Sequence, residues 1–150
     1  MAGPTGKTFK LNLSKWRKKV DGKLDALARQ VSQEIAYRVV TLNMERALDT
    51  GFLAGSWQPS IGEPKVRMAA TADKSAGPVM ADIALVCAGM KAGEIFYMTN
   101  GAAYARRLEY GFVGPDSLGR VYNQAGRHFV RDGVAAAPEI VKQVAAELAG

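Results

Sequence analysis

The sequence predicts one α+β domain, in which helices at the two ends of the chain flank a few short strands. Three observations lead to this prediction. Apolar residues recur every three or four positions from Trp16 to Leu42, which is the period of one helix face. A second helical pattern covers residues 124–148, and the segment "EIFYMTN" between them has the β-branched and aromatic composition of a strand. With 150 residues, 48% of them hydrophobic, the chain can bury one core.

The first helix is expected to begin at Ser14, a residue type that caps helix N-termini, after a mobile arm over residues 1–12. A helix of about 33 residues is roughly 50 Å long, whereas a domain of this size is only about 30–35 Å across. The helix must therefore either break, near Gly22, or project beyond its own core. Its apolar stripe comprises Trp16, Val20, Leu24, Leu27, Val31, Ile35, Val39 and Leu42.

The middle of the chain alternates turns with short elements. Asp49-Thr50-Gly51 favours a turn, and residues 54–61 favour a strand in which Pro59 indicates an edge position or a bulge. Residues 62–77 are rich in Gly, Pro, Lys, Ala and Ser and predict a long loop. Pro78 suits the first turn of a helix that runs to Met90.

In the second half of the chain, glycines and prolines indicate where the elements begin and end. The strand 94–100 leads into a short helix over 102–110, which Gly111 stops. A turn at 114–116 precedes a brief strand in "LGRVYN", and Pro138 should kink or restart the terminal helix. Cys87, the single cysteine, cannot form an internal disulfide and is expected in the core.

The net charge of +6 lies entirely at one end of the chain. Residues 1–23 contain seven basic residues against Asp21 alone, and the other 127 residues carry 13 basic and 13 acidic side chains. Such a segment suits a polyanion or an acidic protein surface, and the alternative is a solvated tail. The basic residues are Lys7, Lys10, Lys15, Arg17, Lys18, Lys19 and Lys23.

No pattern in the sequence predicts a catalytic residue, a cofactor or a metal site. "GPTGKT" has two residues between its glycines, where a phosphate-binding loop needs four, and no strand can precede it. His128 is the only histidine, and no Cys/His cluster or paired carboxylates stand near it. The chain also lacks a run of about 18 apolar residues and the apolar region of a signal peptide, so a soluble intracellular protein without membrane contact is expected. For nucleic acid, only salt-sensitive backbone contact through the basic end is supported.

The block "TNGAAYARRLEYGF", residues 99–112, concentrates Tyr, Arg and Glu. On a helix, Arg106 and Glu109 are three residues apart and close enough to form an ion pair. Tyr104 and Leu108 share one face, and Arg107 and Tyr110 share another. Spacing alone therefore predicts an amphipathic helix with one internal ion pair.

Four segments in this order, "LSKWRKKV", "DTGFLAGSW", "IFYMTNGAAYARRLEYG" and "RHFVRDGV", resemble the small neck proteins of tailed bacteriophages, the tail-completion or head–tail joining family. The resemblance extends from about residue 13 to the end, which implies a single domain over 13–150. It implies a fold in which a long N-terminal helix and a C-terminal helix pack on a small antiparallel β-sheet. The matching residues are Asp49, Thr50, Gly51, Trp57, Thr99, Asn100, Tyr104, Ala105, Leu108, Glu109, Tyr110 and Gly111.

The resemblance also implies a function without catalysis. The chain is expected to be a virion protein, made in the host cytoplasm, that forms a homo-oligomeric ring, generally of six copies, between the head-side connector or adaptor and the tail tube or terminator. The genome passes through this ring. The alternatives are a tail-terminator ring and, from another class, a non-specific nucleic-acid-binding module.

Residues expected to contact partners lie at the basic end, in the 99–112 block and at the start of the terminal helix. Among them, Trp16, Phe112 and Phe129 should be partly exposed in the isolated subunit, since neighbours would cover them in the ring. The full set is Lys7, Lys10, Lys15, Trp16, Arg17, Lys18, Lys19, Tyr104, Arg106, Arg107, Glu109, Tyr110, Phe112, Phe129 and Arg131.

Overall fold

The structure, a computed structural model, describes the backbone of residues 6–67 and 70–149 and the side chains of residues 12–67 and 70–149. The helices are α1 (Gly6–Ala47), α2 (Phe52–Gly55), α3 (Gly77–Ala88), α4 (Ala105–Tyr110), α5 (Phe129–Ala135) and α6 (Ala137–Ala149). The strands are β1 (Trp57–Ile61), β2 (Phe96–Asn100), β3 (Gly111–Pro115) and β4 (Val121–Ala125). The predicted mixture of long terminal helices and small antiparallel sheets is confirmed.

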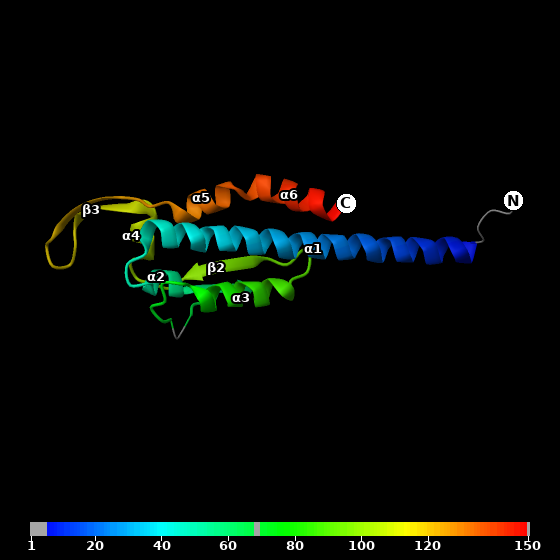
Figure 1. The fold of residues 1–150 in the computed structure, drawn as a ribbon, viewed down its shortest axis with the longest axis horizontal. Coiled ribbons are helices and arrows are strands. Elements are labelled where there is room, and N and C mark those ends of the chain that lie inside the picture. Colours follow the sequence, from blue (N-terminus) through cyan, green and yellow to red (C-terminus); the bar gives the residue numbers. More distant parts are fainter. Residues whose placement is uncertain (1–5, 68–69, 150) are drawn as a thin grey trace.

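Helix α1 is the longest element, and α2, α3, α5 and α6 pack along its C-terminal part (Figure 1). Helices α5 and α6 lie along one side of α1, and α3 lies along another and also packs on β1. The N-terminal part of α1 extends beyond all of them. A helix of 42 residues is roughly 60 Å long, so the expected conflict between helix length and core size is resolved by projection and not by a break at Gly22.

The start of α1 differs from the prediction. The helix begins at Gly6, so Ser14 lies inside it and does not cap its N-terminus. Residues 6–12 of the predicted arm are helical, and residues 1–5 lie outside the described part of the chain. The basic residues from Lys15 onward are therefore carried on a helix.

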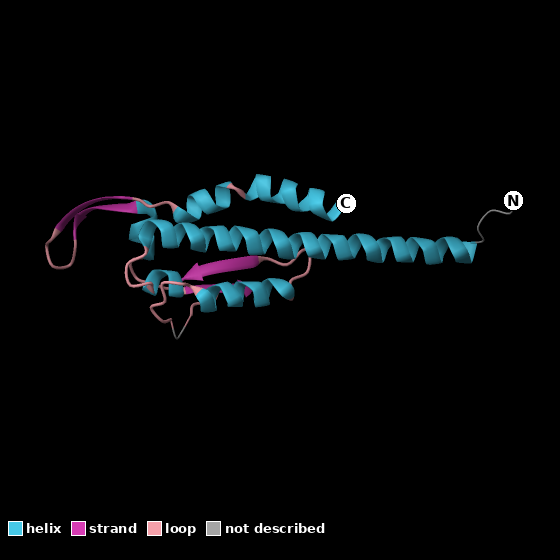
Figure 2. Cartoon of the chain, viewed as in Figure 1, coloured by secondary structure: helices cyan, strands magenta, loops and turns pink. Residues whose placement is uncertain are grey.

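The strands form two separate two-stranded antiparallel sheets instead of the single sheet that was expected. In the first, β1 pairs with β2 from Trp57↔Asn100 to Ile61↔Phe96. In the second, β3 and β4 form a hairpin that projects from the end of the molecule opposite the N-terminus (Figure 2). Helix α4 stands between β2 and β3 in the chain and carries the hairpin away from the first sheet.

Three local predictions need correction. Residues 54 and 55, expected to begin a strand, belong instead to α2, because Gly51 adopts φ 85° and its carbonyl accepts the Gly55 N–H at 2.9 Å. The expected turn at 114–116 is the end of β3, and the hairpin turns at 116–120. There the Asp116 carboxylate accepts the backbone N–H groups of Leu118 and Arg120, each at 2.9 Å. The terminal helix, expected from residue 124, begins only at Phe129, since residues 124 and 125 belong to β4; it is two helices, and α6 restarts beside Pro138 as predicted.

The core lies where α3, β1, α5 and the C-terminal half of α1 meet. The Trp57 indole N–H donates to Asn43 Oδ1 at 2.8 Å, and the Trp57 ring contacts the edge of Phe129 at a centroid distance of 6.2 Å. Phe129 is only 1% exposed, so the prediction that it is a partly exposed contact residue is wrong. Cys87 is buried as predicted, and burial raises the pKa of its thiol to about 11.

Helix α5 approaches α1 most closely at Gly133. A Cβ atom at Gly133 would lie 2.6 Å from the side chain of Val39 and 3.1 Å from its Cα. Both positions are buried. Only a glycine therefore permits this crossing of the two helices at its present distance.

We expect Gly133→Ala to lower the free energy of unfolding by about 1–2 kcal/mol, because overpacking against the α1 backbone outweighs the gain in helix propensity. The matched control is Gly22→Ala on exposed α1, where nothing lies within 4 Å of the added Cβ. That change should raise the free energy of unfolding by up to about 1 kcal/mol. Urea unfolding followed by tryptophan fluorescence measures both, and an equal stabilisation by the two changes would contradict the close crossing.

Candidate functional site

The first candidate surface is the basic helix segment, residues 12–24 of α1, which the other described elements leave uncovered except where the end of α6 reaches Val20, Lys23 and Leu24 (Figure 1). The predicted contact residues Lys15, Arg17, Lys18 and Lys19 are all exposed there. Trp16 is 61% exposed, as expected for an isolated subunit. Lys7 and Lys10 precede it on the same helix, but their side chains lie outside the described part.

The apolar stripe of α1 continues into this segment after its cover has ended. Helix α6 stops at Ala149, and its last turn contacts α1 around a shallow apolar groove. Leu24 in the groove is 47% exposed, and Leu13 beyond it is 51% exposed, in line with Trp16. The segment therefore presents large apolar side chains between lysines and arginines. The groove is lined by Val20, Lys23, Leu24, Leu27, Ala145, Leu148 and Ala149.

The second candidate surface is the 104–112 block at the other end of the molecule. Arg106 lies over the ring of Tyr110, with 5.6 Å from its guanidinium carbon to the ring centroid. Arg107 lies 4.0 Å above the Phe112 ring. Both arginines are exposed, and Tyr110 is 68% exposed. These stacked cations and rings form a polar aromatic surface of the kind that is enriched at protein interfaces.

Glu109, however, faces inward, and its predicted ion pair with Arg106 is wrong. The side chain is 5% exposed and its carboxylate accepts the backbone N–H groups of Val130 at 2.9 Å and Arg131 at 3.0 Å. These are orphan donors in the first turn of α5, where a negative charge also favours the helix dipole. The backbone repeats the connection, because the His128 N–H donates to the Glu109 carbonyl at 3.1 Å. Glu109 therefore fixes α5 to α4 and is not available to a partner.

We expect Glu109→Ala to lower the free energy of unfolding by about 2–3 kcal/mol, since two buried donors at a helix N-terminus lose a charged acceptor. Glu109→Gln keeps the shape but turns an amide NH2 toward one of the donors, so it should still cost more than about 1 kcal/mol. Arg106→Ala is the control and should change stability by less than about 0.5 kcal/mol. Denaturant unfolding of the three variants measures these changes. Equal losses of stability for Arg106→Ala and Glu109→Ala would restore the ion-pair interpretation.

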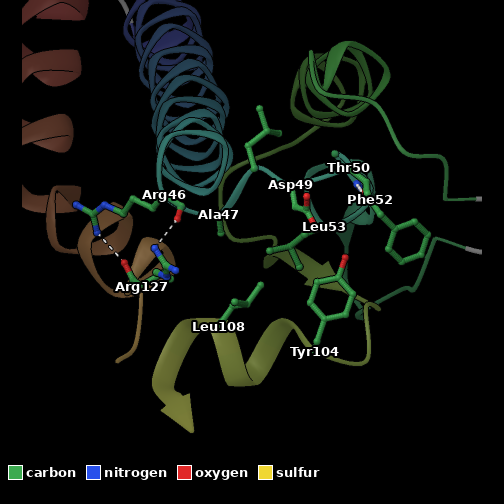
Figure 3. Close-up of a pocket in the computed structure, with 11 residues that line it drawn as sticks. Arg46, Ala47, Asp49, Thr50, Phe52, Leu53, Tyr104, Leu108 and Arg127 are labelled. Atoms are coloured by element: carbon green, nitrogen blue, oxygen red, sulfur yellow. Dashed lines mark hydrogen bonds between the residues drawn. The ribbon is translucent and has the colours of Figure 1, made fainter. Parts of the chain in front are cut away.

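A pocket of about 640 Å³ lies between the end of α1, the turn into α2 and helix α4 (Figure 3). On one side Arg46 and Arg127 face each other, and each donates a hydrogen bond to the other's backbone carbonyl. On the other side lie Phe52 and Tyr104, whose ring centroids are 6.5 Å apart. Desolvation and the negative charge of Asp49 raise the pKa of Tyr104.

The charged groups around this pocket are used by the fold. Arg46 Nη1 donates to Asp132 at 2.6 Å and to the carbonyl of His128 at 3.2 Å. Hydrogen bonds from Arg46 and then Arg131 hold the pKa of Asp132 below its usual value. The Arg131 side chain is largely exposed and hydrogen-bonds only to Asp132 among the described residues. The arrangement can hold an apolar or aromatic side chain of another protein.

The sequence did not reveal a third exposed feature, the β3–β4 hairpin. Val113 is 78%, Leu118 76% and Val121 80% exposed, although all three are large and apolar. The signal was obscured because glycines and a proline at 111–119 indicate turns and hide the alternation of a strand. Phe112, by contrast, is half-buried as predicted, with its ring 6.3 Å from that of Tyr122.

No group of three or more His, Cys, Asp and Glu side chains within residues 12–67 and 70–149 is placed to hold a metal ion. None of the described helices combines the length and apolarity of a membrane span.

Comparison of the chain with protein-family models, with curated proteins and with solved structures gave no match. The resemblance to phage neck proteins therefore rests on the sequence segments alone.

Proposed function

We propose that this chain is a structural protein of the head–tail neck of a tailed bacteriophage, where copies of it form a ring that joins the connector to the tail and lets DNA pass. The observation that carries the proposal is the basic helix segment of α1, which the other described elements leave largely uncovered. A subunit that keeps Leu13, Trp16 and Leu24 exposed in solution is stabilised when another chain covers them.

The chemistry of the basic helix segment favours a protein partner over DNA. Trp16 and Leu13 stand among five basic residues, and apolar side chains of this size gain nothing from a phosphate backbone. A protein surface with an apolar groove and an acidic rim would satisfy both kinds of side chain. The partner that fits is an acidic connector or tail protein.

The two alternatives make different demands on the same residues. A tail-terminator ring would use the same exposed surfaces but contact the tail tube only. A non-specific nucleic-acid-binding module would depend on Lys15, Lys18 and Lys19 and not on Trp16. The basic segment is the observation that favours this second alternative.

Localisation in the particle tests the proposal as a whole. We expect purified particles to contain the chain at the head–tail joint, in a map or by cross-linking to connector and tail proteins. Particles without it would refute the structural role, and a chain found only at the tail side would favour the terminator ring.

We expect Trp16→Ser to block the joining of heads to tails, because loss of a central aromatic anchor costs roughly 2 kcal/mol, or about 30-fold in partner affinity. Its thermal stability should not change, since Trp16 is 61% exposed. Lys142→Gln on exposed α6 is the matched control and should leave joining intact. The measurement is in vitro complementation, in which each purified variant is added to heads and tails that lack this protein and their joining is scored.

Deletion of residues 1–12 should have the same effect as Trp16→Ser while leaving the subunit folded.

The Lys15→Gln, Lys18→Gln, Lys19→Gln triple change separates the partner classes. With a protein partner it should weaken joining less than Trp16→Ser does, and with DNA it should weaken it more and lower the salt dependence. Normal joining by both variants would exclude the basic helix segment from the contact.

A further inference from the structure

Each of the two small sheets has one closed edge and one open edge. The Gly62 N–H donates to the Ile95 carbonyl at 2.9 Å, next to the Ile61↔Phe96 pair. In an antiparallel ladder, bonded and non-bonded pairs alternate. The pairs Ile61↔Phe96, Pro59↔Met98 and Trp57↔Asn100 are therefore the non-bonded ones, and their N–H and C=O groups point away from the partner strand.

The outer edge of β1 is closed. Pro59 has no N–H to present on that edge, and the Trp57 carbonyl accepts Arg67 Nε at 2.9 Å. The outer edge of β2 is open, because within the described chain no backbone hydrogen bond reaches the outward groups of Phe96, Met98 and Asn100. No described helix or strand other than β1 runs alongside β2.

The hairpin shows the same asymmetry. The Asp116 N–H donates to the Arg120 carbonyl at 2.8 Å, so Pro115↔Val121, Val113↔Asn123 and Gly111↔Ala125 are the non-bonded pairs. On β3 the outward residues are Gly111, Val113 and Pro115; Pro115 has no N–H, and the Gly111 N–H already donates to the Arg107 carbonyl. On β4, Val121, Asn123 and Ala125 turn their backbone groups outward, and no backbone hydrogen bond within the described residues reaches them.

Neither open edge carries the devices by which proteins prevent edge pairing. Charged side chains, prolines and bulges normally block such edges. The strands "FYMTN" and "VYNQA" contain no charge and no proline, and both are five residues long with three outward positions. The two edges therefore match in length and in hydrogen-bonding capacity.

We propose that β4 of one copy of this chain pairs with the open edge of β2 in the next copy. The shapes favour this pairing over β2 with β2, and pairing of β4 with β4 would leave the edge of β2 open. Strand β4 stands on a projecting hairpin with exposed side chains, whereas every residue of β2 is half-buried beside the body of the molecule (Figure 2). A projecting strand reaches a recessed edge, but two recessed edges bring the two bodies into collision.

Pairing of this kind also gives β1 and β2 the third strand that a stable sheet needs. It is a head-to-tail contact, which closes into a ring if the rotation between copies permits. The contact thus deepens the proposed function by naming the surfaces that join neighbouring subunits, and only ring closure rests on that function.

Hydrogen exchange on the purified chain, from micromolar to millimolar concentration, tests the contact. We expect the amides of Phe96, Met98 and Asn100 and those of Val121, Asn123 and Ala125 to exchange rapidly in the monomer and about tenfold or more slowly on association. A chain that stays monomeric at millimolar concentration would overturn the proposal. So would an associated form in which these amides stay unprotected.

Two proline variants separate this contact from other modes of association. Asn123→Pro removes one outward N–H from the open edge of β4 and no bond of the hairpin, so it should abolish association and the protection of β2. Val113→Pro, directly across the same non-bonded pair, changes only the closed edge of β3 and should leave both intact. If the NMR spectrum of Asn123→Pro shows that the hairpin has unfolded, Asn123→Lys is used instead, because it places a charge at the same edge.

The outcomes also separate this contact from the proposed function. Protection of β2 that survives Asn123→Pro or Asn123→Lys would show pairing without β4 and refute the contact. Absence of the chain from particles would refute the neck role and leave the exchange result unchanged.

Discussion

The indole N–H of Trp57 donates to the side-chain oxygen of Asn43, and this buried bond joins the first sheet to α1 at the place where α5 also arrives. Asn43 is completely buried, and its Nδ2 has no partner among the described residues. A buried polar bond of this kind adds little net stability, and the unpaired N–H opposes it. Its effect is on geometry, since only one rotation of α1 presents Asn43 to Trp57 while Val39 meets Gly133. This contact therefore sets the orientation of α1 and the direction in which its basic helix segment projects.

A second joint, at Glu109, sets the opposite end. The carboxylate fixes the first turn of α5 to the end of α4, and β3 follows α4 without an intervening residue. The hairpin therefore leaves the body in a direction that is determined by α5, which is itself packed on α1. The inner face of the block at 99–112 holds α4 and α5 together, and its outer face presents stacked arginines and aromatic rings. Because one helix turn carries both roles, its sequence is dense in polar residues without forming a reactive site.

The sequence predicted what depends on local pattern. The stripe from Trp16 to Leu42 identified α1, and the comparison of helix length with core size predicted that it either breaks or projects. Pro78, Gly111 and Pro138 marked boundaries within a few residues. Spacing failed where the partner is distant in sequence. Glu109 sits three residues from Arg106, yet its acceptors are used by N–H groups more than twenty residues away. Phe129 was assigned to the surface because nothing local shows that Trp57 covers it.

The charge distribution limits which surfaces can meet in an assembly. Five basic residues against Asp21 occupy the described side chains of residues 12–24, so two such segments laid side by side would repel each other. Self-association through this end is therefore disfavoured in spite of its exposed apolar residues. The open strands carry no charge and have no such barrier. The proposed contact between copies, near β2 and the hairpin, avoids this repulsion, and the projecting part of α1 is left to the acidic protein proposed as its partner. The open strands and the basic helix segment are separate surfaces, so the two proposed contacts do not compete with each other.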